Sequence, residues 1–148
     1  MTTRLLGGHD RVGIDSNVLI YLFEGSGPQA DVAGAVLDAI GGGEVEGVLA
    51  TLAISEVGTG PARHGDDAMV QRYADELASL ENVRLVPLDR DVAVEAALMR
   101  GAGPLSLADA IHLASAKVAG ATVFVTNDRR ITSVPGLEVR YLDELAIP

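Results

Sequence analysis

Short apolar runs alternate with longer segments of helical spacing along the whole chain. Strands are predicted for the apolar runs at 11–14, 48–52, 83–88, 122–125 and 138–141. Helices are predicted for the segments with apolar residues every three or four positions, at 18–23, 30–40, around Glu56, 66–80, 91–99 and 106–118. Strands that alternate with helices favour a parallel sheet. We therefore predict an α/β fold with a central, mostly parallel sheet of about four to five strands and helices on both faces.

The length of 148 residues fits one compact domain. We expect residues 1–148 to form a single domain, with residues 1–10 as a mobile N-terminus. The sequence has no cysteine, which excludes disulfides, thiolate zinc sites and a thiol nucleophile. The N-terminus has no apolar stretch of signal-peptide length, and no segment reaches the roughly 20 apolar residues that cross a bilayer. We expect a cytoplasmic protein.

The formal net charge is −10 at pH 7. This charge argues against a passive nucleic-acid binder, which would carry a basic face to neutralise phosphates. It is compatible with an enzyme that acts on nucleic acid, because carboxylates that hold divalent cations present positive charge to a phosphate once loaded. The acidic residues that follow the predicted strands are therefore the first candidates for a functional site.

Two acidic residues lie at the ends of predicted strands. Asp15 follows the apolar run 11–14 directly, and Asp128 comes three residues after Val125. The carboxyl ends of parallel strands share one edge of a sheet, and ligands of such folds bind there. Each residue could also serve only as a turn former, because Asp is favoured in turns. We expect both carboxylates at the same edge.

Two further acidic residues lie near predicted helix starts. Asp109 is the third residue after Ser106, which fits a capping box, and a helical wheel places it with His112 on the face opposite Leu107 and Val118. We expect His112 to make packing or polar contacts rather than to act as a general base. Glu56 opens a helix after a predicted strand, where a glutamate often only stabilises the helix dipole. Each acid alone has a structural explanation.

Four segments together resemble the motifs of PIN-domain nucleases, and within that family those of VapC-type toxins. They are 14–21 (IDSNVLIY), 54–57 (ISEV), 105–116 (LSLADAIHLASA) and 125–128 (VTND). The first and third are the specific ones, and the resemblance covers nearly the whole chain. It implies an endoribonuclease whose carboxylates bind Mg²⁺ or Mn²⁺ and which cleaves RNA with metal-activated water.

The resemblance also implies residue roles and partners. The metal-binding and catalytic residues would be Asp15, Glu56, Asp109 and Asp128, with Ser16, Thr126 and Asn127 in supporting positions. Candidates for RNA contact are the nearby basic residues Arg129, Arg130, Arg63 and His64. A cognate VapB-like antitoxin would insert an arginine or lysine among the acids and pack an apolar segment on residues 19–23 and Val57. We also expect a homodimer.

Three alternatives remain open at this point. A free-standing housekeeping PIN nuclease would share the chemistry without the antitoxin. An aspartyl-phosphate phosphatase or phosphotransferase would use Asp15 as nucleophile, but Asn17 stands where that class usually has a second Asp. A non-catalytic binding module would be expected to have lost at least one of the four acids, and all four are present.

Overall fold

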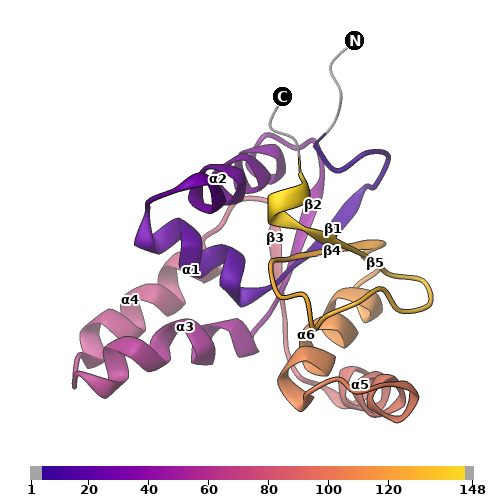
Figure 1. Cartoon of the computed structure of the whole chain (residues 1–148). Helices are drawn as coiled ribbons and strands as arrows, with labels where there is room; N and C mark the ends of the chain where they lie inside the picture. Colours follow the sequence, from indigo (N-terminus) through magenta and orange to yellow (C-terminus); the bar gives the residue numbers. More distant parts are fainter. Residues whose placement is uncertain (1–4, 146–148) are drawn as a thin grey trace.

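The computed structural model describes residues 5–145, which form a five-stranded sheet with all strands parallel (Figure 1). The strands are β1 (Arg11–Ile14), β2 (Glu46–Ala50), β3 (Val83–Val86), β4 (Val123–Thr126) and β5 (Glu138–Tyr141). Their spatial order is β3-β2-β1-β4-β5. The chain leaves β1 toward β2 on one side and later returns to β4 on the other, so the order reverses between β1 and β4. Ligands of doubly wound sheets bind at such a reversal.

The helices of residues 5–145 connect the strands and cover both faces of the sheet (Figure 1). They are α1 (Ser16–Glu24), α2 (Pro28–Gly41), α3 (Leu52–Arg63), α4 (Asp67–Ala78), α5 (Arg90–Ala102), α6 (Leu107–Val118) and the 3₁₀ helix η1 (Leu142–Glu144). Side chains of Asp15, Asp66, Asp89 and Ser106 cap the helices that follow them by accepting backbone N–H bonds. The predicted α/β fold is confirmed.

Alternating strand residues build one core on each face of the sheet. Val12 and Ile14 of β1 point to the core beneath α1 and α2, whereas Gly13 between them faces α6. Phe124 of β4 belongs to the second core, beneath α5 and α6. Because both faces of the inner strands are covered, β2 and β4 are nearly continuous apolar runs, whereas the edge strands β3 and β5 include charged residues.

Helix α6 is buried around most of its circumference. Residues 110–116 are all buried, whereas Leu107 and Val118 are 56% and 44% exposed. The helical wheel was therefore wrong in assigning Leu107 and Val118 to the buried stripe and His112 to the open face. The cause is the position of α6 between the sheet and α5, which leaves only its two ends in contact with solvent.

The N-terminal segment packs on the domain where it is described. Leu5 and Leu6 are buried in the first core, and the His9 ring bonds Thr122 and Glu138. These contacts hold the segment against the domain, and the mobility of residues 5–10 stays a prediction. The same expectation for residues 1–4 lies outside the described residues. Among residues 5–145, no helix has the length and apolar character needed to cross a membrane.

Candidate active site

Asp15 follows β1 at the reversal of strand order and is held by several donors. Its Oδ1 accepts from the Ser16 backbone N–H at 2.8 Å, and its Oδ2 accepts from the Thr126 hydroxyl at 2.7 Å and the Asn17 amide at 3.3 Å. The side chain is 7% exposed. Burial raises the pKa of Asp15, although the nearby His112 and the Thr126 hydrogen bond oppose this rise. The carboxylate is thus fixed in place by β4 and the start of α1.

Glu56 on α3 reaches the same region through His112 on α6. The His112 Nε2 and the Glu56 Oε1 form a hydrogen bond, and the same Nε2 lies 4.0 Å from Asp15 Oδ1. Burial acts to lower the pKa of His112, but the bond to Glu56 and the charges of Asp15, Glu56 and Asp109 outweigh it and raise that pKa. The same bond lowers the pKa of Glu56 against the effect of burial. His112 therefore lies between Glu56 and Asp15, and its raised pKa favours the charged form that offsets these carboxylates.

Asp128 is held by an arginine two residues further along. The Arg130 Nε lies 3.0 Å from Asp128 Oδ1, and its Nη2 lies 2.8 Å from Oδ2, so the guanidinium grips both oxygens. This contact lowers the pKa of Asp128. Asp109, in the first turn of α6, acts on both His112 and Arg130 through its charge. Within residues 5–145 no side-chain partner holds the Asp109 carboxylate.

The structure places the four predicted acids at one edge of the sheet, where three other residues connect them. His112 links Glu56 with Asp15. The Thr126 hydroxyl donates to Asp15 and accepts the Asp128 backbone N–H at 3.0 Å. Arg130 donates hydrogen bonds to Asp128 and is attracted by the negative charge of Asp109.

The predicted supporting residues lie around Asp15. Ser16 and Thr126 bond it directly. The Asn127 backbone N–H donates to the Asn17 side chain at 3.4 Å, and its amide nitrogen donates to Tyr21, so Asn127 ties β4 to α1. The side-chain oxygen of Asn127 is buried and has no partner in the described chain.

The predicted RNA-contact residues divide into two groups. Arg130 lies at the site. Arg129 turns away to Asp143 at 2.6 Å and Glu144 at 2.8 Å, and its guanidinium lies 4.1 Å from the centre of the Tyr141 ring. Arg63 and His64 are exposed at the end of α3, roughly 11 Å along the helix from Glu56. The structure does not bring these three residues to the acids.

The donor chemistry of this edge suits a hard divalent cation, because carboxylate oxygens are the preferred ligands of Mg²⁺. Asn127 adds a buried amide oxygen without a partner among residues 5–145. In that same range, no three acidic or imidazole groups stand together in ligand geometry. His112 and Arg130 hold Glu56 and Asp128, and the exposed Arg130 can turn aside for a metal ion whereas the buried His112 stays in place.

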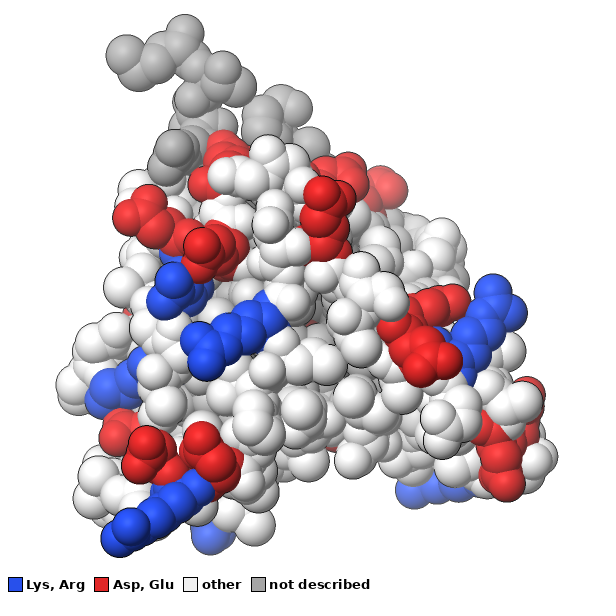
Figure 2. Space-filling view, turned by 180° about the vertical axis from the view of Figure 1, so that it is seen from behind, with Lys and Arg blue, Asp and Glu red and all other residues white. Residues whose placement is uncertain are grey.

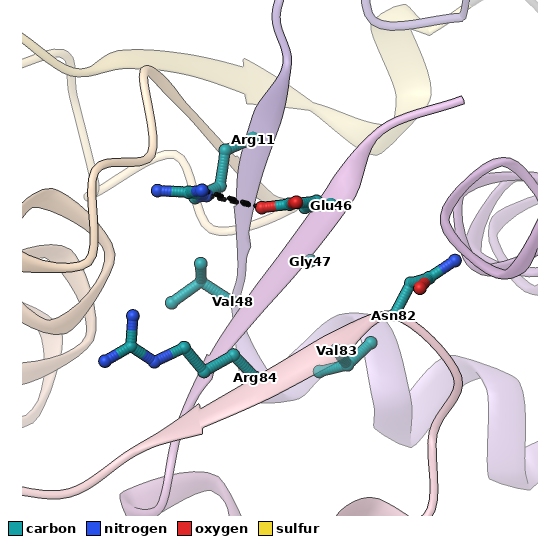
Figure 3. A pocket seen from close by; sticks show the side chains of 7 residues that line it. All are labelled: Arg11, Glu46, Gly47, Val48, Asn82, Val83 and Arg84. Atoms are coloured by element: carbon teal, nitrogen blue, oxygen red, sulfur yellow. Dashed lines mark hydrogen bonds and ion pairs between the residues drawn. The ribbon is translucent and has the colours of Figure 1, made fainter. Parts of the chain in front are cut away.

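A hollow of about 320 Å³ elsewhere on the sheet is not part of this site (Figure 3). Its lining includes Arg11, which is paired with Glu46 at 2.7 Å, and Arg84 on the edge strand β3. Arg11 and Glu46 are the first residues of β1 and β2, whereas the acids follow the ends of strands. The hollow therefore opens at the other end of the sheet.

Sequence reasoning missed the roles of two residues. His112 bridges Glu56 and Asp15, and its position three residues after Asp109 on one helix face was the available signal. Asn17 donates to both Asp15 and Thr126, at 3.3 Å and 3.2 Å. Its position two residues after Asp15 carried no signal of this role.

The chain was compared with models of protein families, with curated proteins and with solved structures. The PIN domain model matches residues 12–137. A search of curated proteins gives no match. A toxin–antitoxin complex from Klebsiella pneumoniae is similar in structure, with 21% identity, a TM-score of 0.64 and coverage of 86% of this chain and 95% of that chain.

Two further solved structures are similar in fold. VapBC2 from Rickettsia felis, bound to a DNA fragment from its promoter, has 13% identity, a TM-score of 0.66 and coverage of 88% of this chain and 98% of that chain. VapC20 from Mycobacterium tuberculosis, described as a Sarcin-Ricin loop cleaving toxin, has 15% identity, a TM-score of 0.59 and coverage of 76% and 86%. The motifs, the acidic edge and the family match agree, and this chain belongs to the PIN-domain family.

Proposed function

We propose that this chain is a metal-dependent endoribonuclease and the toxin of a type II toxin–antitoxin pair. The observation that supports it most is the convergence of four carboxylates, from four separate segments, on the edge where the strand order of a PIN-domain sheet reverses. The similarity to toxins of VapC type supports the finer assignment. The metal would be Mg²⁺ or Mn²⁺.

The four carboxylates would have unequal roles. Asp15, Asp109 and Asp128 would hold the metal directly, and Glu56 would bind a second ion or orient water. A bound divalent cation would supply positive charge for the scissile phosphate and lower the pKa of a coordinated water. Thr126 and the Ser16 backbone fix Asp15, so that one ligand is in place before binding. The pairing of His112 with Glu56 would keep that acid from repelling Asp15 in the metal-free protein.

Phosphate binding would depend on individual cations rather than on a broad basic surface. Figure 2 shows acidic and basic side chains interspersed over one face of the molecule. Arg130 is 86% exposed and can turn from Asp128 to a phosphate once that carboxylate holds a metal ion. The arginine would then bind RNA where the acid had been neutralised.

A groove beside Glu56 would take the antitoxin. It measures about 220 Å³, and its lining includes Ile20, Phe23, Glu56, Val57 and Tyr73. Phe23 and Tyr73 stack at 5.0 Å between ring centres, which makes one wall of the groove flat and rigid. An apolar antitoxin segment would pack there, and its arginine or lysine would pair with Glu56. Adding Mn²⁺ to the purified complex should release the antitoxin, and a complex indifferent to Mn²⁺ would place it elsewhere.

Acid-to-amide substitutions test the nuclease assignment. Asp15→Asn, Asp109→Asn and Asp128→Asn should each lower the rate of Mg²⁺- or Mn²⁺-dependent RNA cleavage by at least about 100-fold while the circular dichroism spectrum stays unchanged. Products should carry 5′-phosphates. Asp75→Asn on the exposed face of α4 is the matched control and should cleave normally. Wild-type cleavage by any of the three variants would remove that residue from the metal site.

A further inference from the structure

A second groove borders the acids on the side away from α3. It measures about 540 Å³ and lies between α5, the connection from α5 to α6, Lys117 in the last turn of α6, and the loop after β4. Its apolar lining comes from Leu98, Met99, Ala102, Leu105, Val134 and Pro135. The volume falls within the ~300–1,000 Å³ typical of small-molecule sites.

The groove is continuous with the candidate active site. Leu105 comes four residues before Asp109, and Arg130, which lines the groove, grips Asp128. Arg130 thus joins the groove to the acids. A ligand seated in the groove would contact Arg130, which the proposed function assigns to a phosphate of the RNA.

The walls of the groove are fixed before any ligand binds. Val134 and Leu137 exchange backbone hydrogen bonds of 3.2 Å and 3.0 Å across a turn centred on Pro135 and Gly136. Gly136 has a φ of +82°, which suits the third position of a type II turn that follows proline. On the opposite wall, Lys117 of α6 pairs with Glu95 of α5 at 2.8 Å.

Positive charge and polar groups surround the apolar floor. Arg130 and Lys117 line the groove, and Lys117 is paired with Glu95 at 2.8 Å. Arg130 is 86% exposed and can leave Asp128, so it is the cation that favours a phosphate-bearing ligand over an apolar protein helix. Thr132 and Glu95 add groups that can hydrogen-bond the edge of a base.

We propose that this groove receives one unpaired nucleobase of the RNA substrate, with Arg130 on the adjoining phosphate. The proposal rests on the nuclease function proposed above. Proteins that select RNA sequences usually splay a base out of the strand and hold it between apolar or aromatic side chains while polar groups read its edge. Leu98, Met99 and Pro135 would hold the two faces of the base, and Thr132, Glu95 and Lys117 would read its edge. The groove would thus determine which nucleotide lies next to the cleaved bond.

Nucleotide binding tests the proposal without cleavage. The four nucleoside 5′-monophosphates and ribose 5-phosphate are titrated into the metal-free protein, and the methyl NMR signals of Met99, Leu105 and Val134 are followed. We expect at least one nucleotide to shift these signals saturably and to bind about tenfold more tightly than ribose 5-phosphate. If the nucleotides and ribose 5-phosphate shifted the signals equally, the groove would bind only the phosphate and the base proposal would be wrong. No response to any nucleotide would also overturn it.

A matched pair of substitutions on α5 locates the binding. Ala102→Phe fills the groove, whereas Ala93→Phe adds the same ring to an exposed position nine residues earlier, on the opposite side of the helix. We expect Ala102→Phe to weaken nucleotide binding about tenfold or more and Ala93→Phe to leave it within about twofold. A dimer in sedimentation that Ala102→Phe alone disrupts, without any nucleotide response, would instead make this face a contact between two copies.

RNA cleavage assayed in parallel separates this proposal from the nuclease assignment. Wild-type cleavage without a nucleotide response would overturn the base groove and leave the nuclease assignment standing. Absence of cleavage with both Mg²⁺ and Mn²⁺ would overturn the nuclease assignment. Ala102→Phe should also change the nucleotide preference at the cleavage site, and Ala93→Phe should not.

Discussion

Glu56 and Asp128 are each held by a basic side chain, but the two pairs differ in burial. His112 on Glu56 is 1% exposed, whereas Arg130 on Asp128 is 86% exposed. A buried cation that moves away leaves its carboxylate partner without a counter-charge, which costs free energy. A surface arginine can rotate into water at little cost. The pair of His112 and Glu56 should therefore stabilise the folded protein. The pair of Arg130 and Asp128 should instead open when Asp128 binds metal, and Arg130 should then contact an RNA phosphate.

The largest effect on stability should come from His112→Ala. The substitution leaves a cavity and removes the counter-charge of Glu56, so we expect a loss of roughly 2–4 kcal/mol in the free energy of unfolding. His64→Ala, at the exposed residue that follows α3, should change it by less than about 0.5 kcal/mol. Urea unfolding measures both. Equal effects of the two substitutions would remove the distinction between buried and exposed partners.

Gly13→Ala should lower the stability by disturbing the packing of α6, the helix that carries His112, against β1. A Cβ at Gly13 would lie 2.5 Å from the Ala116 Cβ and 2.8 Å from the Phe124 ring, so α6 would have to move from β1. We expect a loss of about 1–3 kcal/mol. Gly34→Ala on α2 meets nothing within 4 Å and should instead add about 0.5–1 kcal/mol. A stabilised Gly13→Ala protein would show that the contact between α6 and β1 is loose.

The pH dependence of stability should report the His112 pair. The pKa of His112 is raised by Glu56, Asp15 and Asp109, so its contribution is fully present below about pH 6.5 and is lost as the pH rises through the higher pKa of the folded chain. Glu56, whose pKa is lowered, contributes above about pH 4.5 and loses its contribution as the pH falls through its folded pKa.

The difference in unfolding free energy between wild type and His112→Gln isolates this effect. Asp15 is present in both proteins and loses stability of its own as the pH rises through its raised pKa, so the difference is the quantity to follow. We expect it to be largest between the two folded pKa values and to shrink above that of His112. A difference that stays constant up to pH 9 would mean that His112 is neutral in the fold.

The smallest effect on stability should come from Arg130→Ala, because its guanidinium is exposed to water and surface ion pairs contribute little. The same substitution should weaken RNA binding several-fold and reduce the slope of affinity against salt by roughly one phosphate contact. Arg129→Ala is the matched neighbour, because Arg129 is engaged by Asp143 and Glu144. It should leave RNA binding unchanged. A weaker RNA complex with Arg129→Ala alone would reverse their roles.

The sequence was sufficient for the fold and for the edge at which the acids lie. Apolar runs predict strands that are buried on both faces, and Asp15 and Asp128 follow two of them, so strand order alone brings them together. The motifs around Glu56 and Asp109 supplied the other two acids.

The partners of these acids could not be predicted from sequence. Whether Arg129 or Arg130 reaches Asp128 depends on one residue of loop geometry, and the structure assigns Arg130. The burial of His112 depends on α6 lying between the sheet and α5, and helical periodicity does not reveal a helix covered on both sides. The groove beside Arg130 forms from loop and helix ends far apart in the chain.

Binding of Mn²⁺ by the purified protein tests the central claim most directly, because the claim is that this acidic edge holds a divalent cation. Free Mn²⁺ is measured by electron paramagnetic resonance during titration of wild type, Asp15→Asn, Asp109→Asn and the control Asp75→Asn. We expect wild type and Asp75→Asn to bind Mn²⁺ equally and the two site variants to bind it at least about tenfold more weakly. Wild-type protein that leaves all Mn²⁺ free, or site variants that bind it as tightly as wild type, would contradict the account.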